Sequence, residues 1–275
     1  QRSQSAIVNL VQRYAHWLHP LSCFIISLTV YVSTMPRTIT LEDAGLFQLV
    51  CHLGGISHPP GYPLYTVLCT SFVPALDLAN KVLAGNLLSA FFASIAVAVF
   101  HQICYLLRDR SFAWIAAMAY AFSATFWSQA IIIEVYSLAV LMFLTCVWAA
   151  LKFSRSGDFR YWYLLGFLYG LALSNHWPMM ILTTPVLLVL LAESFQSLRE
   201  KLASPVFWIL SILCGLLGLS PYIFLVYDSE PVIAVYGGIN SIEQFYFYVT
   251  RSIYPDGNEV ANYSDRLKFF LWIIK

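Results

Sequence analysis

The chain has 275 residues, of which 60% are hydrophobic and 11% are charged, and its formal net charge is +1. This composition excludes an ordinary soluble domain, and the near-neutral charge gives no sign of nucleic-acid binding. The apolar runs are continuous, which favours membrane helices over a β-barrel with alternating apolar and polar residues. We therefore predict an all-α, polytopic transmembrane helical bundle.

The apolar runs predict about eight membrane spans. We expect them at residues 17–35, 82–107, 111–129, 135–153, 161–176, 177–194 and 205–227, with an incomplete one from about 267. The first run lacks a small-residue cleavage site and is expected to be a retained helix. Residues 62–76 are too short to cross a bilayer, so a juxtamembrane or re-entrant helix is expected there. Because the chain starts at Gln1 and stops inside an apolar run, we expect an N-terminal fragment of a longer protein.

Basic residues set the expected orientation. With the N-terminus in the cytoplasm, most Lys and Arg residues fall in the inner loops, as the positive-inside rule requires. Most acidic residues fall on the outer side, and acids contribute little to topology, so their bias indicates a polar site there. We expect one integral multi-pass domain, 1–275, in a bacterial inner membrane or the endoplasmic reticulum. Its outer loops are expected at 36–81 and 228–265.

The six cysteines form no CxxC pair, and four of them fall inside predicted spans. They are Cys23, Cys51, Cys69, Cys104, Cys146 and Cys214. We interpret them as small apolar packing residues rather than as a disulfide or zinc framework.

The first outer loop carries two acids and a rigid turn. Glu42 or Asp43 could deprotonate an acceptor hydroxyl or hold a metal bound to a phosphate, although a solvated loop acid or a helix N-cap is the alternative. His58 opens the sequence His-Pro-Pro-Gly-Tyr-Pro, in which three prolines and a glycine leave few conformations. Such a turn could aim His58 at a phosphate or a leaving group, or could merely link two segments.

Three further outer turns place polar groups beside aromatic residues. The candidates there are Trp127, Gln129, Glu134, Tyr136, His176, Arg251 and Tyr254. Glu134 could face the same cavity as Asp43, or could favour the start of a helix through the helix dipole. His176 and Arg251 could bind a phosphate, or could belong to an interfacial aromatic belt or helix.

A resemblance to a known family is carried by two segments, Leu41–Leu46 and His58–Tyr65, with Leu53-Gly54 between them. They resemble the signature of the transmembrane-protein-260 type family, which belongs with the protein O-mannosyltransferase-like, GT-C fold membrane glycosyltransferases. The likeness continues through 127–129 and 134–136 to Arg251 and Tyr254, and so covers about residues 38–255.

The resemblance implies an enzyme that moves a mannose-like sugar from a polyprenyl-phosphate donor to a hydroxyl of an acceptor protein or glycan, at the outer or lumenal face. Asp43 matches the catalytic acid, with Glu42 and Glu134 as further carboxylates. Many relatives have Asp-Ser-Gly-Glu where this chain has Asp43-Ala44-Gly45-Leu46, so the trailing glutamate is missing. The expected phosphate ligands are His58, His176 and Arg251. The expected substrate contacts are Tyr62, Tyr65, Trp127, Gln129, Tyr136 and Tyr254.

No cofactor is certain from the sequence, although the Glu42–Asp43 pair is compatible with a divalent metal. The implied partners are the donor, the acceptor and the lipid bilayer, without nucleic acid. Two other functions stay open. A carrier or flippase for a lipid-linked or small polar solute would place charges deep in its spans, whereas here they lie at the ends. An inactive scaffold is compatible with Leu46.

Overall fold

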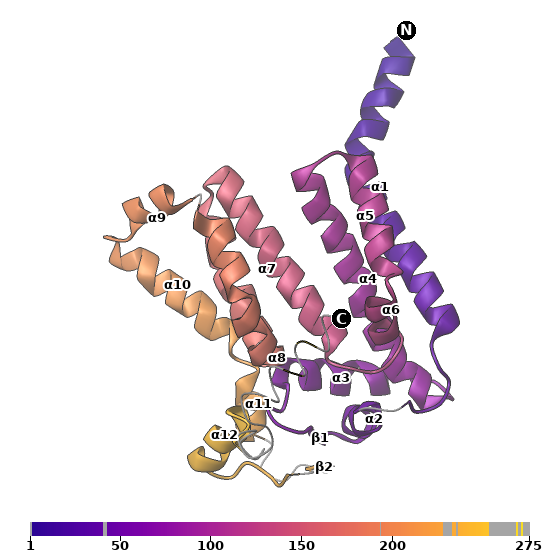
Figure 1. Cartoon of the computed structure of the whole chain (residues 1–275), viewed down its shortest axis with the longest axis vertical. Coiled ribbons are helices and arrows are strands. Elements are labelled where there is room, and N and C mark those ends of the chain that lie inside the picture. The colour runs from indigo at the N-terminus through magenta and orange to yellow at the C-terminus, as the bar shows by residue number, and fades with distance from the viewer. Residues whose placement is uncertain are drawn as a thin grey trace.

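A computed structural model of the chain describes residues 2–40, 43–192, 194–227, 233–234 and 236–252, with residues 268 and 271. This part is a bundle of helices (Figure 1). The long helices are α1 (Arg2–Thr34), α4 (Lys81–Leu107), α7 (Tyr136–Ser156) and α8 (Phe159–Ala192). The shorter ones are α2 (Ala44–Leu53), α3 (Pro63–Ala75), α5 (Arg110–Ala121), α6 (Ala124–Ala130), α9 (Phe195–Lys201), α10 (Pro205–Gly218), α11 (Tyr222–Tyr227) and α12 (Ile242–Val249). Two short parallel strands, β1 (Gly55–Ile56) and β2 (Ile233–Ala234), pair with each other.

Four helices in the described ranges are long and apolar enough to cross a membrane, namely Trp17–Thr34 of α1, α4, α7 and α8. Together with the apolar composition they identify a membrane protein. The expected count of about eight spans is not supported. The predicted span 111–129 is divided into α5 and α6 at residues 122–123, and 205–227 is divided into α10 and α11. Hydropathy averaged over a long window does not show these breaks, although Ser123 lies at the first and Ser220 and Pro221 lie at the second. The span expected from about 267 lies outside the described residues, except for residues 268 and 271.

Helix α8 consists of two halves joined at His176, whose φ of −144° and ψ of 77° are not helical. The hydroxyls of Tyr169 and Thr184, fifteen residues apart, are hydrogen-bonded at 2.7 Å. A straight helix would separate these residues by about 22 Å along its axis. The second half therefore folds back along the first, and the break falls at the boundary predicted between 161–176 and 177–194.

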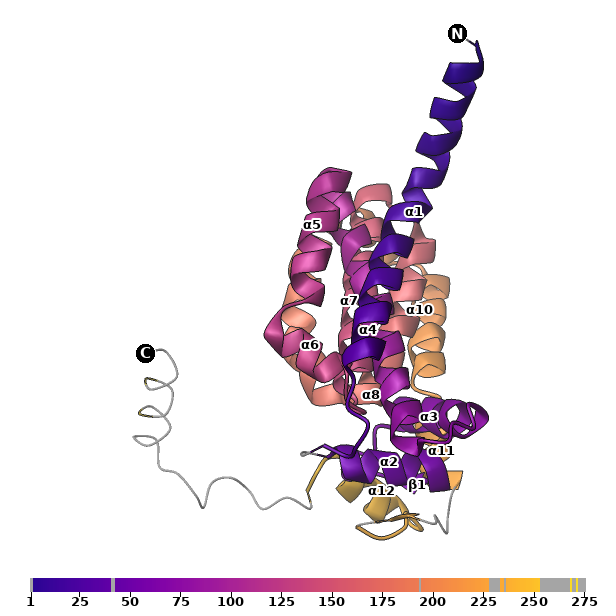
Figure 2. The ribbon, with the colours of Figure 1, turned by 90° about the vertical axis from the view of Figure 1, so that its right-hand side faces the viewer.

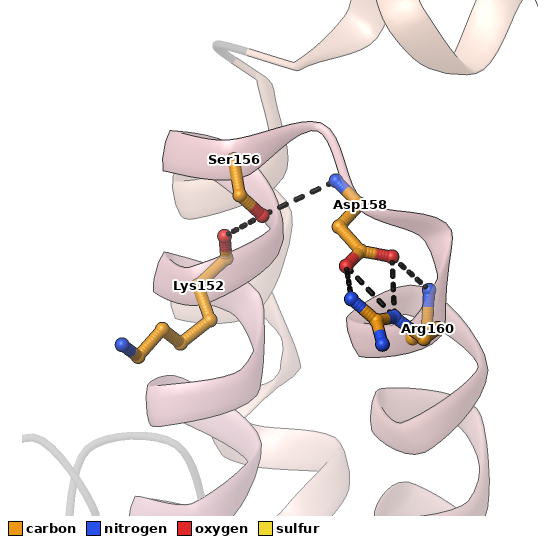
Figure 3. Close-up of polar contacts among 4 residues, drawn as sticks. All are labelled: Lys152, Ser156, Asp158 and Arg160. Atoms are coloured by element: carbon orange, nitrogen blue, oxygen red, sulfur yellow. Dashed lines mark hydrogen bonds and ion pairs between the residues drawn. The ribbon is translucent and has the colours of Figure 1, made fainter.

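The bundle has two distinct ends (Figures 1 and 2). One end, here called the α9 end, holds α9 and the turn between α7 and α8. In that turn Asp158 binds Arg160 through Oδ2 and Nη2 at 2.6 Å, and Ser156 accepts a hydrogen bond from the Asp158 N–H at 3.2 Å (Figure 3). The other end, here called the α3 end, holds α2, α3, α11, α12 and the break at His176. Every residue of the candidate site that the structure describes comes from segments at or near the α3 end.

Helix α4 forms the centre of the bundle and packs against α1, α5 and α7. Its buried face carries small residues such as Ala93 and Ala96, which allow the close approach of neighbouring helices. At the α3 end its buried Asn86 donates to the Pro36 carbonyl and accepts from the Ile133 N–H, both at 2.9 Å. This one side chain thereby holds the segment after α1 and the segment before α7 against the same helix.

Candidate active site

The floor of the α3 end is made by the short helices α2 and α3, which lie across the end of the bundle (Figure 2). A disulfide between Cys51 and Cys69 joins them, with the two Cα atoms 5.1 Å apart. The expectation that all six cysteines are packing residues is therefore wrong for this pair. The reason is that residues 44–53, expected to be loop, form a helix that lies beside α3. The other four cysteines are free thiols.

The His-Pro-Pro-Gly-Tyr-Pro segment forms a tight, mostly buried turn between β1 and α3. Gly61 has a φ of +87°, and a Cβ there would lie 3.1 Å from the side chain of Leu225 in α11. The Tyr248 hydroxyl of α12 donates a hydrogen bond to the Ser57 carbonyl. Pro63 occupies the first turn of α3, where a missing N–H costs nothing. The turn is therefore held by α11 and α12, contacts that its composition alone does not predict.

Asp43 and His58 meet at this turn, with the carboxylate Oδ2 3.1 Å from the imidazole Nε2. Asp43 stands just before α2, yet its side chain makes no capping hydrogen bond to that helix. The Nδ1 of His58 lies 3.1 Å from the Pro59 carbonyl oxygen. Each ring nitrogen of His58 thus lies 3.1 Å from an oxygen atom, one of a side chain and one of the backbone. The His58 side chain is 13% exposed and the Asp43 side chain 56%, so the carboxylate is open to solvent.

A row of rings connects His58 to the break in α8. The Tyr62 ring lies 5.2 Å from the His58 ring and 5.6 Å from the His176 ring, between ring centroids. The His176 ring lies 6.0 Å from that of Tyr136 at the start of α7. The His176 Nδ1 accepts a hydrogen bond from the Met179 N–H at 3.2 Å, which leaves Nε2 as the donor of the neutral ring.

Arg251 is brought to this row by the segment after α12. The Trp177 indole N–H donates to the Val249 carbonyl at 2.9 Å, which fixes the end of α12 beside the break in α8. Arg251 follows Val249 by two residues, and His176 directly precedes Trp177, so this hydrogen bond brings Arg251 near His176. The three residues expected to bind a donor phosphate thus come together from three distant parts of the chain.

Glu134 lies deeper, with 2% of its surface exposed. Its backbone N–H donates to the Ser89 hydroxyl at 3.2 Å. Tyr65 is fully buried nearby, and burial followed by the Glu134 carboxylate raises the pKa of its hydroxyl. Both residues are buried, and their expected roles as a second acid and a substrate contact stay predictions.

The remaining candidates lie at different places. Gln129 and Tyr136 line a groove of about 470 Å³ between α5, α6, α7 and the second half of α8. Trp127 packs against Phe122, and its indole N–H donates to the Thr34 hydroxyl at 3.1 Å. Glu42 and Tyr254 lie outside the described residues.

Sequence reasoning missed Phe47 and Tyr248. The Phe47 ring of α2 lies 5.9 Å from the His58 ring and 5.8 Å from the Tyr62 ring, and thus supports both. The apolar periodicity of residues 44–53 could have indicated its buried position. No sequence signal connects Tyr248 to Ser57, 191 residues away. Within the described ranges no three His, Cys, Asp or Glu side chains gather as metal ligands would, and a divalent metal stays a prediction.

Residues 43–199, more than half of the chain, match the family model described as "Protein O-mannosyl-transferase TMEM260 N-terminal domain". The chain belongs to this family. It is 27% identical over 206 residues to the mouse protein O-mannosyl-transferase TMEM260, covering 73% of this chain and 29% of that protein. It is 29% identical over 226 residues to the protein O-mannosyl-transferase tmem260 of Dictyostelium discoideum, covering 74% of this chain and 26% of that protein. The chain thus spans less than a third of the length of these TMEM260 relatives. No solved structure matches it.

Proposed function

We propose that the protein is the membrane-embedded part of a GT-C type glycosyltransferase that moves a mannose-like sugar from a polyprenyl-phosphate donor to a hydroxyl of a protein or glycan acceptor. The single observation that carries this proposal is the contact between the exposed Asp43 carboxylate and the His58 imidazole, 3.1 Å apart. The pair lies beside Tyr62 and His176 at one end of an apolar bundle. The names of the relatives support the same reaction class.

In the proposed reaction the acceptor oxygen attacks the anomeric carbon of the sugar in a single displacement. The bond from that carbon to the phosphate oxygen breaks, and the lipid phosphate leaves with the bonding electron pair. Asp43 takes the proton of the attacking hydroxyl, because a carboxylate exposed at the membrane edge can reach it. His58 holds the carboxylate in place, and positioning of this kind lowers the barrier by fixing the geometry of attack.

The donor is proposed to lie along the groove that Gln129 and Tyr136 line. Tyr136 connects this groove to His176, since the two rings are 6.0 Å apart. The Nε2–H of His176 and the guanidinium of Arg251 would hold the leaving phosphate, and Arg suits a phosphate because its donors form a planar fork. The apolar wall of the groove, which includes Val140 and Met179, would hold the first isoprene units.

The α3 end is proposed to face an oxidising compartment, either the lumen of the endoplasmic reticulum or the periplasm. The Cys51–Cys69 disulfide supports this face, because disulfides persist in oxidising compartments and are rare in the cytosol. The α9 end carries Arg108, Arg110 and Arg155, which agrees with a cytoplasmic side. In this orientation the protein is multi-pass and the N-terminus is cytoplasmic.

The test is sugar transfer by the purified full-length protein, measured with a panel of radiolabelled polyprenyl-phosphate sugars and acceptor peptides. Asp43→Asn should lower transfer by about 10²- to 10⁴-fold, the usual contribution of a general base. Asp77→Asn is the matched control, because Asp77 lies at the same end, is 91% exposed and pairs only with Lys81 among the described residues. Full activity of a folded Asp43→Asn protein would refute the assignment. Transport of a donor without any transfer would favour a carrier, and neither activity would favour a scaffold.

A further inference from the structure

A second site lies at the α9 end, away from the candidate active site. Two adjoining cavities, of about 300 and 390 Å³, share Trp17, Val99 and Gln102 and so form one groove over α4, between α1 and α7. Thr145, Trp148 and Lys152 of α7 line one side of this groove, and Lys152 lies at its mouth. We call it the α1–α7 groove.

The two parts of the α1–α7 groove differ in chemistry. At the mouth, the Lys152 ammonium lies 5.9 Å from the centroid of the Trp148 ring, one turn before the end of α7. Gln102 and Thr145 add polar groups to the lining, and Thr145 lies about 10 Å deeper along α7 than Lys152. Toward the middle of the bundle the lining is apolar, with Leu21, Phe24 and Ile95. From Gln102 to Ile95 the groove descends by about 10 Å along α4.

The charge of the mouth is positive and has no acidic counterpart in the lining. Asp109 and Asp158 lie at the same end, but they are engaged with Arg108 and Arg160. Among the described residues no acid forms a salt bridge with Lys152. Tryptophan and lysine side chains near the end of a membrane helix are typical of the level of lipid headgroups.

We propose that the α1–α7 groove is a binding site for one anionic phospholipid. Lys152 binds the anionic headgroup, and Trp17 and Trp148 border this headgroup. One acyl chain lies along Leu21 and Phe24. Charge favours a lipid over an additional helix as the occupant, because a basic pocket between membrane helices matches an anionic headgroup. The site is independent of the proposed transfer reaction, so either could fail without the other.

The experiment uses the full-length protein, and native mass spectrometry counts bound dioleoyl-phosphatidylserine against dioleoyl-phosphatidylcholine. Phosphatidylserine should bind more tightly. Lys152→Gln should weaken its binding about fivefold, which is ~1 kcal/mol, the contribution of one basic side chain near anionic lipid. Lys152→Arg should retain binding because it keeps the charge.

Lys201→Gln is the matched control. Lys201 lies at the same end and its ammonium is 5.7 Å from the Phe159 ring, but it does not line the groove. Equal binding of the two lipids, or equal losses in the Lys152→Gln and Lys201→Gln proteins, would overturn the proposal. Photoactivatable phosphatidylserine should also label peptides that contain Gln102 or Lys152. A groove filled by another helix would give no such adduct and would equally overturn the proposal.

Discussion

Asp43 and His58 are fifteen positions apart in the sequence, and their side chains meet with Oδ2 3.1 Å from Nε2. The histidine is packed into the α3 end, since its ring lies against those of Phe47 and Tyr62. The aspartate is the more exposed partner. The pair therefore holds a carboxylate against the protein while leaving it accessible to solvent.

Loss of the His58 ring should lower the rate of transfer without unfolding the protein. We expect His58→Gln to reduce kcat about 10- to 100-fold, because Asp43 loses its positioning partner. His52→Gln is the control, since the His52 Nε2 contacts the Lys81 carbonyl at the same end. In the Asp43→Asn background His58→Gln should add little, because residues that act as a unit are not additive. Two independent, multiplying losses would contradict this coupling.

The disulfide between Cys51 and Cys69 should be present in the native protein. Non-reducing peptide mapping should recover one linked pair of peptides, and alkylation of either residue without a reductant would contradict the structure. Cys51→Ser with Cys69→Ser should lower the free energy of unfolding by about 2–4 kcal/mol, the usual effect of opening a loop of this size. Cys214→Ser is the control, because Cys214 is a free thiol.

The sequence pattern was enough to place the short helix α3 and the break at His176. It did not place α2, whose ten residues are too few to be stable alone and which depends on packing against α3. It also merged α5 with α6, because the residues at their junction, such as Phe122, are as apolar as the helices themselves. The formation of α2 and the separation of α5 from α6 depend on tertiary contacts, which a hydropathy pattern does not contain.

Successive loops of a membrane bundle lie at opposite ends, and this rule predicts that Asp43, His58 and His176 share one end. It does not predict which ring of the Tyr62–Tyr65 pair reaches them. Tyr62 precedes α3 in a left-handed conformation, with a φ of 43°, and its ring lies beside His176. Tyr65, one turn later, falls on the core face of α3. The order of these rings follows from backbone geometry that a hydrophobic pattern does not contain.

Arg251 should affect binding of the donor more than the chemical step. We expect Arg251→Gln to raise the KM for the lipid-phosphate donor about tenfold, with a smaller change in kcat, because a charge-assisted hydrogen bond to phosphate is lost. Arg251→Lys should recover only part of the affinity, since lysine cannot form the planar fork. Arg37→Gln is a control of equal charge at the same end, where Arg37 is exposed. If Arg251→Gln and Arg37→Gln had the same KM for the donor, a donor-binding role of Arg251 would be excluded.

Where helices α8 and α10 cross, Gly170 and Gly218 should tolerate no larger residue. A Cβ at Gly170 would lie 2.4 Å from the Gly215 carbonyl oxygen, and one at Gly218 would lie 2.2 Å from the Phe167 carbonyl oxygen. These are backbone atoms, so the helices must separate to admit a larger residue. Gly170→Val should therefore lower the free energy of unfolding by about 1–3 kcal/mol, measured as a lower midpoint of thermal unfolding in detergent.

Gly215 supplies the matched control for this crossing. A Cβ built there meets nothing within 4 Å, so Gly215→Ala should leave the midpoint unchanged or raise it slightly through helix propensity. The crossing also matters for the site, because α10 leads into α11, whose Leu225 packs against Gly61 of the turn that carries His58. Separation of α8 from α10 should thus reduce transfer as well as stability. A Gly170→Val protein as stable as Gly215→Ala would show that the two backbones are not in contact.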